Sequence, residues 1–177
     1  MRGGSRWMAA LAACFAAILV PACESGSSTT PPGASTTCRA SQLGAARLGT
    51  AAAAGHIVVT YGLQNTSTGA CTLFGYPGVQ MVDRAGRALA TQVSHGGSYT
   101  FVGETPAAVA LAPGVQASFF LGYSDVPAGN RTGCAPSSRI DITPPGDTAA
   151  VMVADQIAPC GGAVTVSPVH AGTAPPP

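Results

Sequence analysis

The side chains best suited to acid–base or nucleophilic chemistry are few in this chain, and they do not follow a known catalytic spacing. A serine or cysteine hydrolase needs a nucleophile, a base and an orienting group together. The chain has 3 histidines and no Gly-x-Ser-x-Gly segment, which would expose a serine nucleophile. We expect His56 on the outward face of a strand, His95 in a solvated loop and His170 at a frayed C-terminus. The sequence therefore does not favour a hydrolase.

Metal ligands and paired carboxylates are equally sparse. Copper sites in small β-domains need clustered His or Met side chains, but Met81 and Met152 are isolated and no His-x-His spacing occurs. A glycosidase needs two carboxylates that face one cleft, and the sequence pairs none. We interpret the carboxylates beyond Glu24 as solvated surface charge: Asp83, Glu104, Asp125, Asp141, Asp147 and Asp155. We therefore predict no catalytic residue, no metal site and no cofactor.

Composition excludes further classes of protein. All 8 basic residues are arginines, so chemistry that needs a lysine, such as Schiff-base formation, is excluded. The formal net charge of +1 argues against a nucleic-acid-binding protein. The 177 residues suffice for one ordinary domain, and charged residues make up only 8% of them. We expect a monomer with one domain that folds outside the cytosol.

Residues 1–22 have the pattern of a signal peptide. Arg2 and Arg6 precede the apolar run Met8–Val20, which is shorter than the roughly 20 residues of a membrane span. The segment Val20-Pro21-Ala22-Cys23 resembles a bacterial lipobox, in which the Cys23 thiol receives a diacylglyceryl group. Such a group supplies the two chains that stable anchoring needs. We therefore predict Cys23 as a lipidation site; the alternative is a secretory signal cut after Ala22.

The mature chain divides by composition. Residues 23–37 are rich in Ser, Thr, Pro and Gly and carry no large apolar side chain, so we expect a disordered tether behind the lipidated cysteine. Residues 38–169 form the predicted domain. Residues 170–177 end in three prolines and are expected to form a disordered tail.

Apolar and polar residues alternate through residues 38–169, which indicates half-buried strands rather than helices. The alternation is found at Ile57–Leu63, Val109–Leu111, Val115–Leu121, Ile140–Ile142 and Val164–Val166. Residues that favour turns separate these runs at Asn65–Gly69, Asp83–Gly86, Ser94–Gly97, Pro113–Gly114 and Pro144–Asp147. Short strands with this punctuation predict an all-β fold, an immunoglobulin-like antiparallel β-sandwich.

Four cysteines remain in the predicted domain, and an even number in an exported protein favours two disulfides. Three pairings are possible. We favour Cys38–Cys71 and Cys134–Cys160, because each pair brackets a predicted hairpin whose ends are neighbours. A redox role is disfavoured because no Cys-x-x-Cys spacing occurs.

The order of the motifs resembles an actinobacterial family of secreted proteins and lipoproteins that carry a single domain of unknown function. The motifs, in chain order, are Cys38, Asn65-Thr66-Ser67, Cys71-Thr72-Leu73-Phe74-Gly75-Tyr76-Pro77-Gly78-Val79, Leu111-Ala112-Pro113-Gly114, Cys134, Pro144-Pro145-Gly146, Cys160 and Val166-Ser167-Pro168-Val169. The resemblance implies an exported all-β domain with frequent lipid anchoring. It implies no activity and no catalytic residue.

The most specific of these motifs has a structural interpretation. We expect Leu73 and Val79 in the core, Gly75 at a bulge and Pro77-Gly78 in a tight turn. Tyr76 is held extended before the proline and is expected to bury its ring with its hydroxyl bonded to backbone. The alternative is that Tyr76 stacks on a ligand.

These observations favour a non-catalytic binding domain on the outer face of the cell membrane, or a secreted one. Its partner would be an envelope protein, a glycan or a lipid. Tyr99 and Phe101, in a loop rich in glycine and serine, are candidate contact residues, although the same pattern fits a strand that packs inward. The alternative function is an enzyme or metal carrier whose site is assembled from distant loops.

Overall fold

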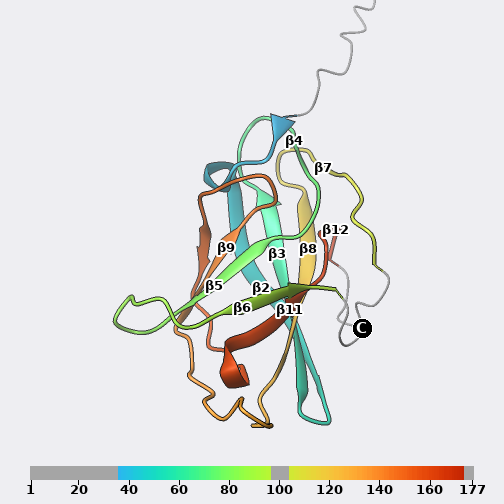
Figure 1. The fold of residues 1–177 in the computed structure, drawn as a ribbon. Helices are drawn as coiled ribbons and strands as arrows, with labels where there is room; N and C mark the ends of the chain where they lie inside the picture. The colour runs from blue at the N-terminus through green and yellow to red at the C-terminus, as the bar shows by residue number, and fades with distance from the viewer. Residues whose placement is uncertain (1–35, 97–103, 174–177) are drawn as a thin grey trace, which may run out of the picture. The chain divides into compact units, whose positions relative to one another are not determined.

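The computed structural model describes residues 36–96 and 104–173, which Figure 1 draws as a ribbon. Strands make up the regular structure of these residues, together with two short 3₁₀ turns, η1 (Ala40–Gln42) and η3 (Cys160–Gly162). The described ranges hold no α-helix. The prediction of an all-β fold is confirmed.

The largest unit of the fold is one sheet, called here the large sheet. Its strands are β2 (Leu43–Ala53), β3 (His56–Asn65), β8 (Gln116–Ser124), β11 (Ala163–Val166) and β6 (Gln92–His95), in that spatial order, and β12 (His170–Ala171) also pairs with β8. All these pairs are antiparallel except β11–β6, which is parallel. The β2–β3 hairpin and the β3–β8 pair carry the longest ladders.

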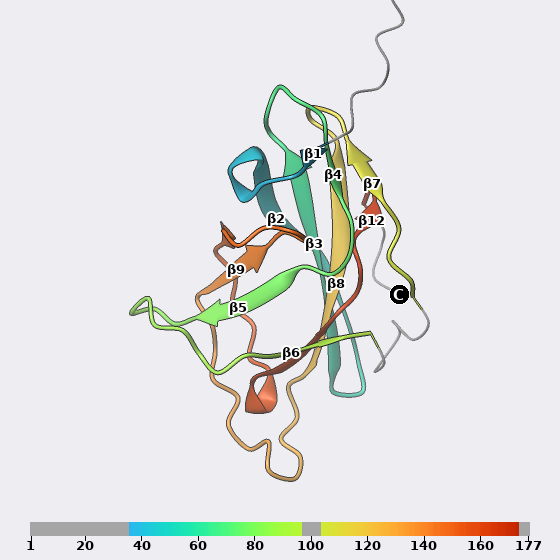
Figure 2. The same cartoon turned by 45° about the horizontal axis from the view of Figure 1, so that its top comes forward.

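Two smaller sheets complete the sandwich. One has the order β10–β9–β5, formed by Val151–Val153, Arg139–Thr143 and Gly78–Val82, and the other has the order β1–β4–β7, formed by Thr36–Thr37, Cys71–Leu73 and Val109–Leu111. Figures 1 and 2 show β5 and β9 crossing one face of the large sheet. Buried side chains of both layers, such as Leu121 of β8 and Ile140 of β9, share one core cluster. Most strand pairs are antiparallel, as expected for an immunoglobulin-like sandwich. The exceptions are β11–β6 and β1–β4, which are parallel.

The alternation read from the sequence places the core correctly in β3 and β8. Val59, Tyr61 and Leu63 are fully buried, and the Tyr61 ring stacks on Phe119 with ring centroids 5.6 Å apart. The opposite face of the same strands is not simply solvated, because Val58 and Phe120 form a second small buried cluster there. Ser118, a polar position in the alternating pattern of β8, is also fully buried. The large sheet is therefore covered on both faces along its central strands.

Several boundaries differ from those predicted. Thr36–Thr37 pair with β4 rather than continuing the tether, and His170–Ala171 pair with β8 beyond the expected domain end at Val169. Ser94 and His95, expected in a turn, belong to β6.

The predicted tight turn at Pro77-Gly78 is also wrong, since Gly78 begins β5. The chain bends instead at Gly75, whose φ is +113°. These segments are ordered by partners distant in sequence, which local turn chemistry does not reveal.

The turn predicted at Asn65–Gly69 has a side-chain cause. Asn65 is fully buried, and its amide nitrogen donates to the carbonyl oxygens of Gly69, at 2.8 Å, and Leu111, at 2.9 Å. Its Oδ1 accepts from the Ser67 backbone N–H at 3.0 Å. One side chain thus closes the turn and joins it to β7, which explains why this position carries asparagine.

Both predicted disulfides are confirmed. Cys38–Cys71 and Cys134–Cys160 join residues 33 and 26 positions apart. The first pair brackets the β2–β3 hairpin and the second brackets the β9–β10 hairpin, as expected. Loops of this size contribute roughly 3–4 kcal/mol each in the chain-entropy view. The second bridge also fixes the loop after β8 to the start of β11.

Gly162 and Gly172 offer a matched test of backbone crowding. Both have positive φ, at +69° and +75°, but a Cβ at Gly162 would lie 2.1 Å from the carbonyl oxygen of Ala90, whereas a Cβ at Gly172 would meet nothing within 4 Å. We predict that Gly172→Ala lowers the free energy of unfolding by about 1–2 kcal/mol, the cost of a left-handed alanine. Gly162→Ala should cost more than about 4 kcal/mol, because backbone atoms must move. Urea denaturation measures both, and equal losses would contradict the packing at Ala90.

Candidate functional site

A groove of about 800 Å³ lies on the face of the large sheet that points away from the main core. The register places His56 opposite Ser124 and Thr165 opposite Ser94, so these side chains share that face. The described residues that line the groove are Ala51, Ala52, Ala53, Ala54, His56, Val58, Ser94, Ser124, Arg131, Cys160, Ala163, Val164 and Thr165. Strands far apart in the sequence therefore build one concave surface.

The groove has an apolar floor because its strands carry small side chains there. The run Ala51–Ala54 ends β2 and forms part of the turn to β3, and Val58 and Ala163 continue the apolar lining. The turn is tight, with φ of +50° at Ala54 and +77° at Gly55, which is the geometry of a two-residue type I′ hairpin. Alanine side chains leave room above the sheet that larger residues would fill.

Ser94, Ser124 and Thr165 bring hydroxyl groups to this apolar surface, and the protein fixes their positions. The Ser94 and Thr165 hydroxyl oxygens lie 2.8 Å apart, and Ser94 also donates to the carbonyl oxygen of Val164 at 3.2 Å. The Ser124 hydroxyl accepts from the Val126 backbone N–H at 3.2 Å. Preset polar groups of this kind orient a ligand in a mainly apolar pocket.

Arg131 is the one arginine among the described lining residues, and no described carboxylate lines the groove. The backbone of Arg131 is held by a tight turn, in which its N–H donates to the carbonyl oxygen of Ala128 at 2.9 Å. Its side-chain stem lies against Gly161, where an added Cβ would approach the Arg131 Cγ to 2.8 Å. The Gly161 N–H donates to the carbonyl oxygen of Gly133, and the neighbouring Cys134–Cys160 bridge fixes both segments. The guanidinium forms no ion pair with any residue in the described ranges.

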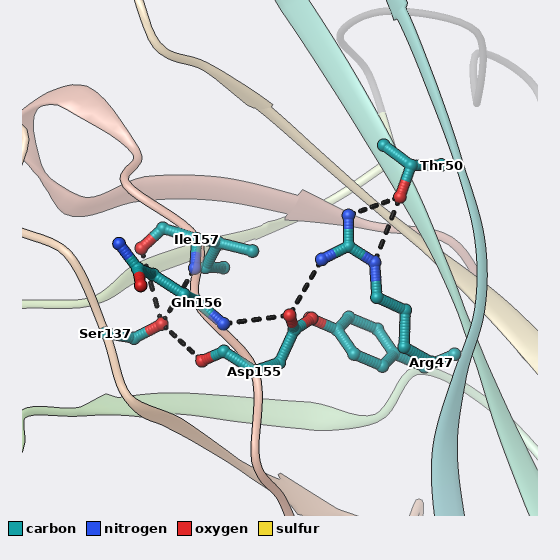
Figure 3. A network of polar contacts seen from close by, with 7 residues as sticks. Arg47, Thr50, Ser137, Asp155, Gln156 and Ile157 are labelled. Carbon is teal, nitrogen blue, oxygen red and sulfur yellow. Dashed lines mark hydrogen bonds and ion pairs between the residues drawn. The ribbon is translucent and has the colours of Figure 1, made fainter.

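The best-formed group of polar contacts lies elsewhere, between the layers, around Asp155 (Figure 3). The Asp155 side chain is only 8% exposed; Arg47 Nη1 donates to its Oδ1 at 2.7 Å and the Tyr61 hydroxyl donates to its Oδ2 at 2.7 Å. Arg47 also donates to the Thr50 hydroxyl. The interpretation of Asp155 as solvated surface charge is therefore wrong, because it pairs with a cation from β2 and accepts a hydrogen bond from a buried phenol of β3.

Asp147 is a second carboxylate that is not solvated. Its side chain is 9% exposed and accepts the Ala40 backbone N–H at 2.7 Å. Backbone hydrogen bonds from Ala40 and Thr148 hold the pKa of Asp147 below its ordinary value. This carboxylate ties the segment before β2 to the β9–β10 turn, and its role is structural.

Ser137 extends the contacts around Asp155 along the chain. Its hydroxyl donates to the carbonyl oxygen of Asp155 at 2.9 Å and accepts from the Ile157 backbone N–H at 3.0 Å, as Figure 3 shows. The Gln156 N–H donates to Asp155 Oδ1 at 2.8 Å. The segment that leads from β10 to Cys160 is therefore pinned at consecutive residues.

The Asp155–Tyr61 pair is not arranged for acid–base chemistry. Burial, and then the hydrogen bond to Asp155, raise the pKa of Tyr61 far above its ordinary value of 10.0. A phenol that keeps its proton is a poor base or nucleophile. Both Asp155 oxygens already accept hydrogen bonds from the protein. The pair stabilises the fold.

Tyr76 adopts the predicted structural role. It is half-buried, and its hydroxyl donates to the carbonyl oxygen of Glu104 at 3.3 Å. Its ring stacks on His95, with centroids 4.6 Å apart and planes 9° apart. His95 is exposed, as expected, but this stacking orders its ring. The ligand-stacking alternative for Tyr76 is not needed to explain its position.

His170 is not at a frayed end, as the sequence had indicated. It lies in β12, its Nε2 is 3.4 Å from Glu104 Oε2, and its ring tilts against Phe120 at a centroid distance of 5.5 Å. His56, by contrast, is exposed on the outward face, as predicted, and lines the groove. The structure therefore brings His56, but neither His95 nor His170, to the groove.

The remaining predicted site residues, Cys23, Tyr99 and Phe101, lie outside the described residues. Within the described ranges, no three His, Cys, Asp or Glu side chains are grouped so as to hold a metal ion. No helix in those ranges is long and apolar enough to cross a membrane. The sequence did not predict Arg131, Ser94 and Thr165 as groove residues. The one sequence signal for this face was the alternation that places His56 on the outward side of its strand.

These features define a disulfide-bonded, all-β domain with a concave outer sheet face. Residues 38–170 match the family described as "Domain of unknown function (DUF4232)", which covers most of the chain. The chain therefore belongs to the DUF4232 family, in agreement with the resemblance to a family with a single domain of unknown function. Neither a curated protein nor a solved structure matches the chain.

Tyr61→Phe tests the buried pair. The variant leaves Asp155 Oδ2 buried without its donor, so we predict a loss of about 2–3 kcal/mol in the free energy of unfolding at pH 7. Tyr76→Phe, the control, loses only a long bond to a carbonyl and should cost less than about 1 kcal/mol. Chemical denaturation measures both, and equal costs would contradict the assignment.

The same pair predicts a response to alkali. Because the Tyr61 pKa is raised in the folded state, the unfolded chain loses a proton above about pH 10 that the folded chain keeps. Stability should therefore be constant below that pH and fall above it. The fall should be smaller in Tyr61→Phe, although Tyr123, whose pKa burial also raises, leaves part of it. Denaturation from pH 8 upward compares the two proteins, and identical slopes would contradict the prediction.

Proposed function

We propose that this protein is an exported, lipid-anchored module of the cell envelope that binds a ligand in the groove of the large sheet and does not catalyse a reaction. The observation that carries the proposal is the groove itself. Its volume of about 800 Å³ lies within the range of small-molecule sites, roughly 300–1,000 Å³. Its lining is mainly apolar with a few fixed polar groups, which is the usual composition of such sites.

The contacts inside the domain support binding rather than catalysis. The strongest candidate acid–base pair, Asp155 with Tyr61, is committed to holding β2 and β3 against the second layer. In the groove, the Ser94, Thr165 and Ser124 hydroxyls bond to neighbouring protein atoms.

Export is supported by the disulfides and by the N-terminal sequence. Two disulfides in a domain of this size are typical of an oxidising compartment. The charged and apolar pattern of residues 1–22 and the lipobox-like Val20–Cys23 favour a lipoprotein signal. A diacylglyceryl group on Cys23 would leave the domain at the outer face of the membrane, where envelope ligands are accessible.

Filling the groove tests the binding function. Ala53 shares the face of His56, and Ala53→Trp should fill the hollow; Ala149→Trp, at an exposed position outside the lining, is the matched control. Full-length wild-type protein purified from its membrane, analysed by native mass spectrometry, should carry a bound molecule that the control keeps and Ala53→Trp loses. Melting temperatures should show that both variants fold. A wild-type protein without ligand after exposure to envelope extract, or a ligand that Ala53→Trp retains, would overturn the proposal, and conversion of the ligand to a product would make the protein an enzyme.

Cys23→Ser tests the anchor. The wild-type protein should fractionate with membranes and carry the mass of a diacylglyceryl group, whereas the variant should appear in the soluble fraction without it. The prediction rests on the two acyl chains being the membrane attachment. Unlipidated wild-type protein in the medium would show that the signal is a plain secretory one.

A further inference from the structure

We propose that the ligand of the groove is a single-chain anionic amphiphile, whose acyl chain lies on the alanine-rich floor and whose carboxylate pairs with Arg131. The inference rests on the proposed binding function and names the chemistry of the ligand. Three properties of the groove carry it: the charge of its lining, its apolar floor and its dimensions.

The charge of the lining selects an anion. Arg131 lines the groove with an exposed side chain, and the described lining residues include no Asp or Glu. A guanidinium that loses water without gaining a partner is costly, so a neutral or cationic ligand is disfavoured. A carboxylate accepts two parallel N–H donors from arginine, which is a strong and geometrically specific contact. The preferred ligand therefore has one negative head group near Arg131.

The floor selects an apolar body. Ala51, Ala53, Val58 and Ala163 offer methyl groups on this face, and the nearby hydroxyls of Ser94 and Thr165 already bond to each other. His56 is the one ring among the described lining residues, so the broad aromatic platforms on which sugars stack are missing there. An acyl chain gains binding free energy for each CH₂ group that it buries on such a surface. The lining thus favours a lipid over a glycan.

The dimensions select a long, thin ligand. The lining runs from β2 through β3, β8 and β11 to β6, which are consecutive neighbours in the large sheet. Four strand spacings of about 4.8 Å make a path of roughly 19 Å. This length suits a long acyl chain, and a volume of about 800 Å³ is a small-molecule site rather than a protein interface.

Arg131 lies beside Gly161, just before β11, and its guanidinium forms no ion pair within the described ranges. The turn from Ala128 to Arg131 fixes the backbone, and the side-chain stem lies against Gly161 beside the Cys134–Cys160 bridge. The aliphatic part of the arginine is thereby packed, while the guanidinium remains available to a ligand. This combination distinguishes Arg131 from Arg47 and Arg139, whose guanidinium groups pair with Asp155 and Asp141.

The test uses the full-length protein after any ligand bound in the groove has been removed. Isothermal titration calorimetry then measures the binding of two probes, palmitate and its uncharged analogue hexadecanol. Wild-type protein should bind palmitate at least about tenfold more tightly than hexadecanol, the effect of one charge-assisted contact. Arg131→Gln should weaken palmitate binding by about the same factor and leave hexadecanol binding unchanged. Arg84→Gln, at an exposed position outside the groove lining, is the control and should match the wild type.

The outcomes separate the two proposals. Equal affinity for palmitate and hexadecanol, or palmitate binding that survives Arg131→Gln, overturns the assignment of an anionic head group. If hexadecanol binds and Ala53→Trp abolishes its binding, the groove remains the binding site and only the head-group assignment fails. If neither probe binds while envelope extract still loads the groove, the ligand is not a single-chain amphiphile. If Ala53→Trp changes no binding of any kind, the proposed function fails as well.

Discussion

The buried carboxylate of Asp155 is the constraint on which much of this domain depends. It accepts hydrogen bonds from Arg47 of β2 and Tyr61 of β3. One side chain therefore joins the β2–β3 hairpin of the large sheet to the segment that follows β10. That segment continues to Cys160 and Gly161, against which the stem of Arg131 packs. The position of the groove's arginine therefore depends, through a short stretch of chain, on a carboxylate between the layers. Breaking one partner of such a pair leaves an uncompensated buried group, which is far more costly than the pair is favourable.

The parts of the fold that follow from local pattern were predictable from the sequence. The alternation in Ile57–Leu63 identified both the strand and its core face, and turn residues placed Pro113–Gly114 and Asp83–Gly86 correctly. The disulfides could be chosen from three pairings because each closes around a hairpin. In these cases a period of two residues or a short turn contains all the information that is needed.

Other features depend on partners far away in the chain. In the sequence, Asp147 and Asp155 have the pattern of solvated turn and loop carboxylates. In the fold they accept hydrogen bonds from Ala40 and Arg47, which lie more than a hundred residues earlier in the chain. The ends of the domain were misjudged for the same reason, because Thr36–Thr37 and His170–Ala171 are too short to show a pattern and exist only through pairing. The groove was not foreseen because its residues meet through the register of strands, and a list of small residues in sequence does not predict a hollow.

The two outer strands of the large sheet also bear on how the protein behaves at high concentration. With charged residues at only 8%, electrostatic repulsion between molecules is weak, so protection against aggregation must come from shape. β6 is four residues long and exposes Gln92 and Ser94 at one edge, whereas β2 has a bulge between Arg47 and Gly49 that interrupts the other. Short, polar or irregular edges resist edge-to-edge pairing with another molecule. At high concentration, such a domain can stay separate from its neighbours with few charges to repel them.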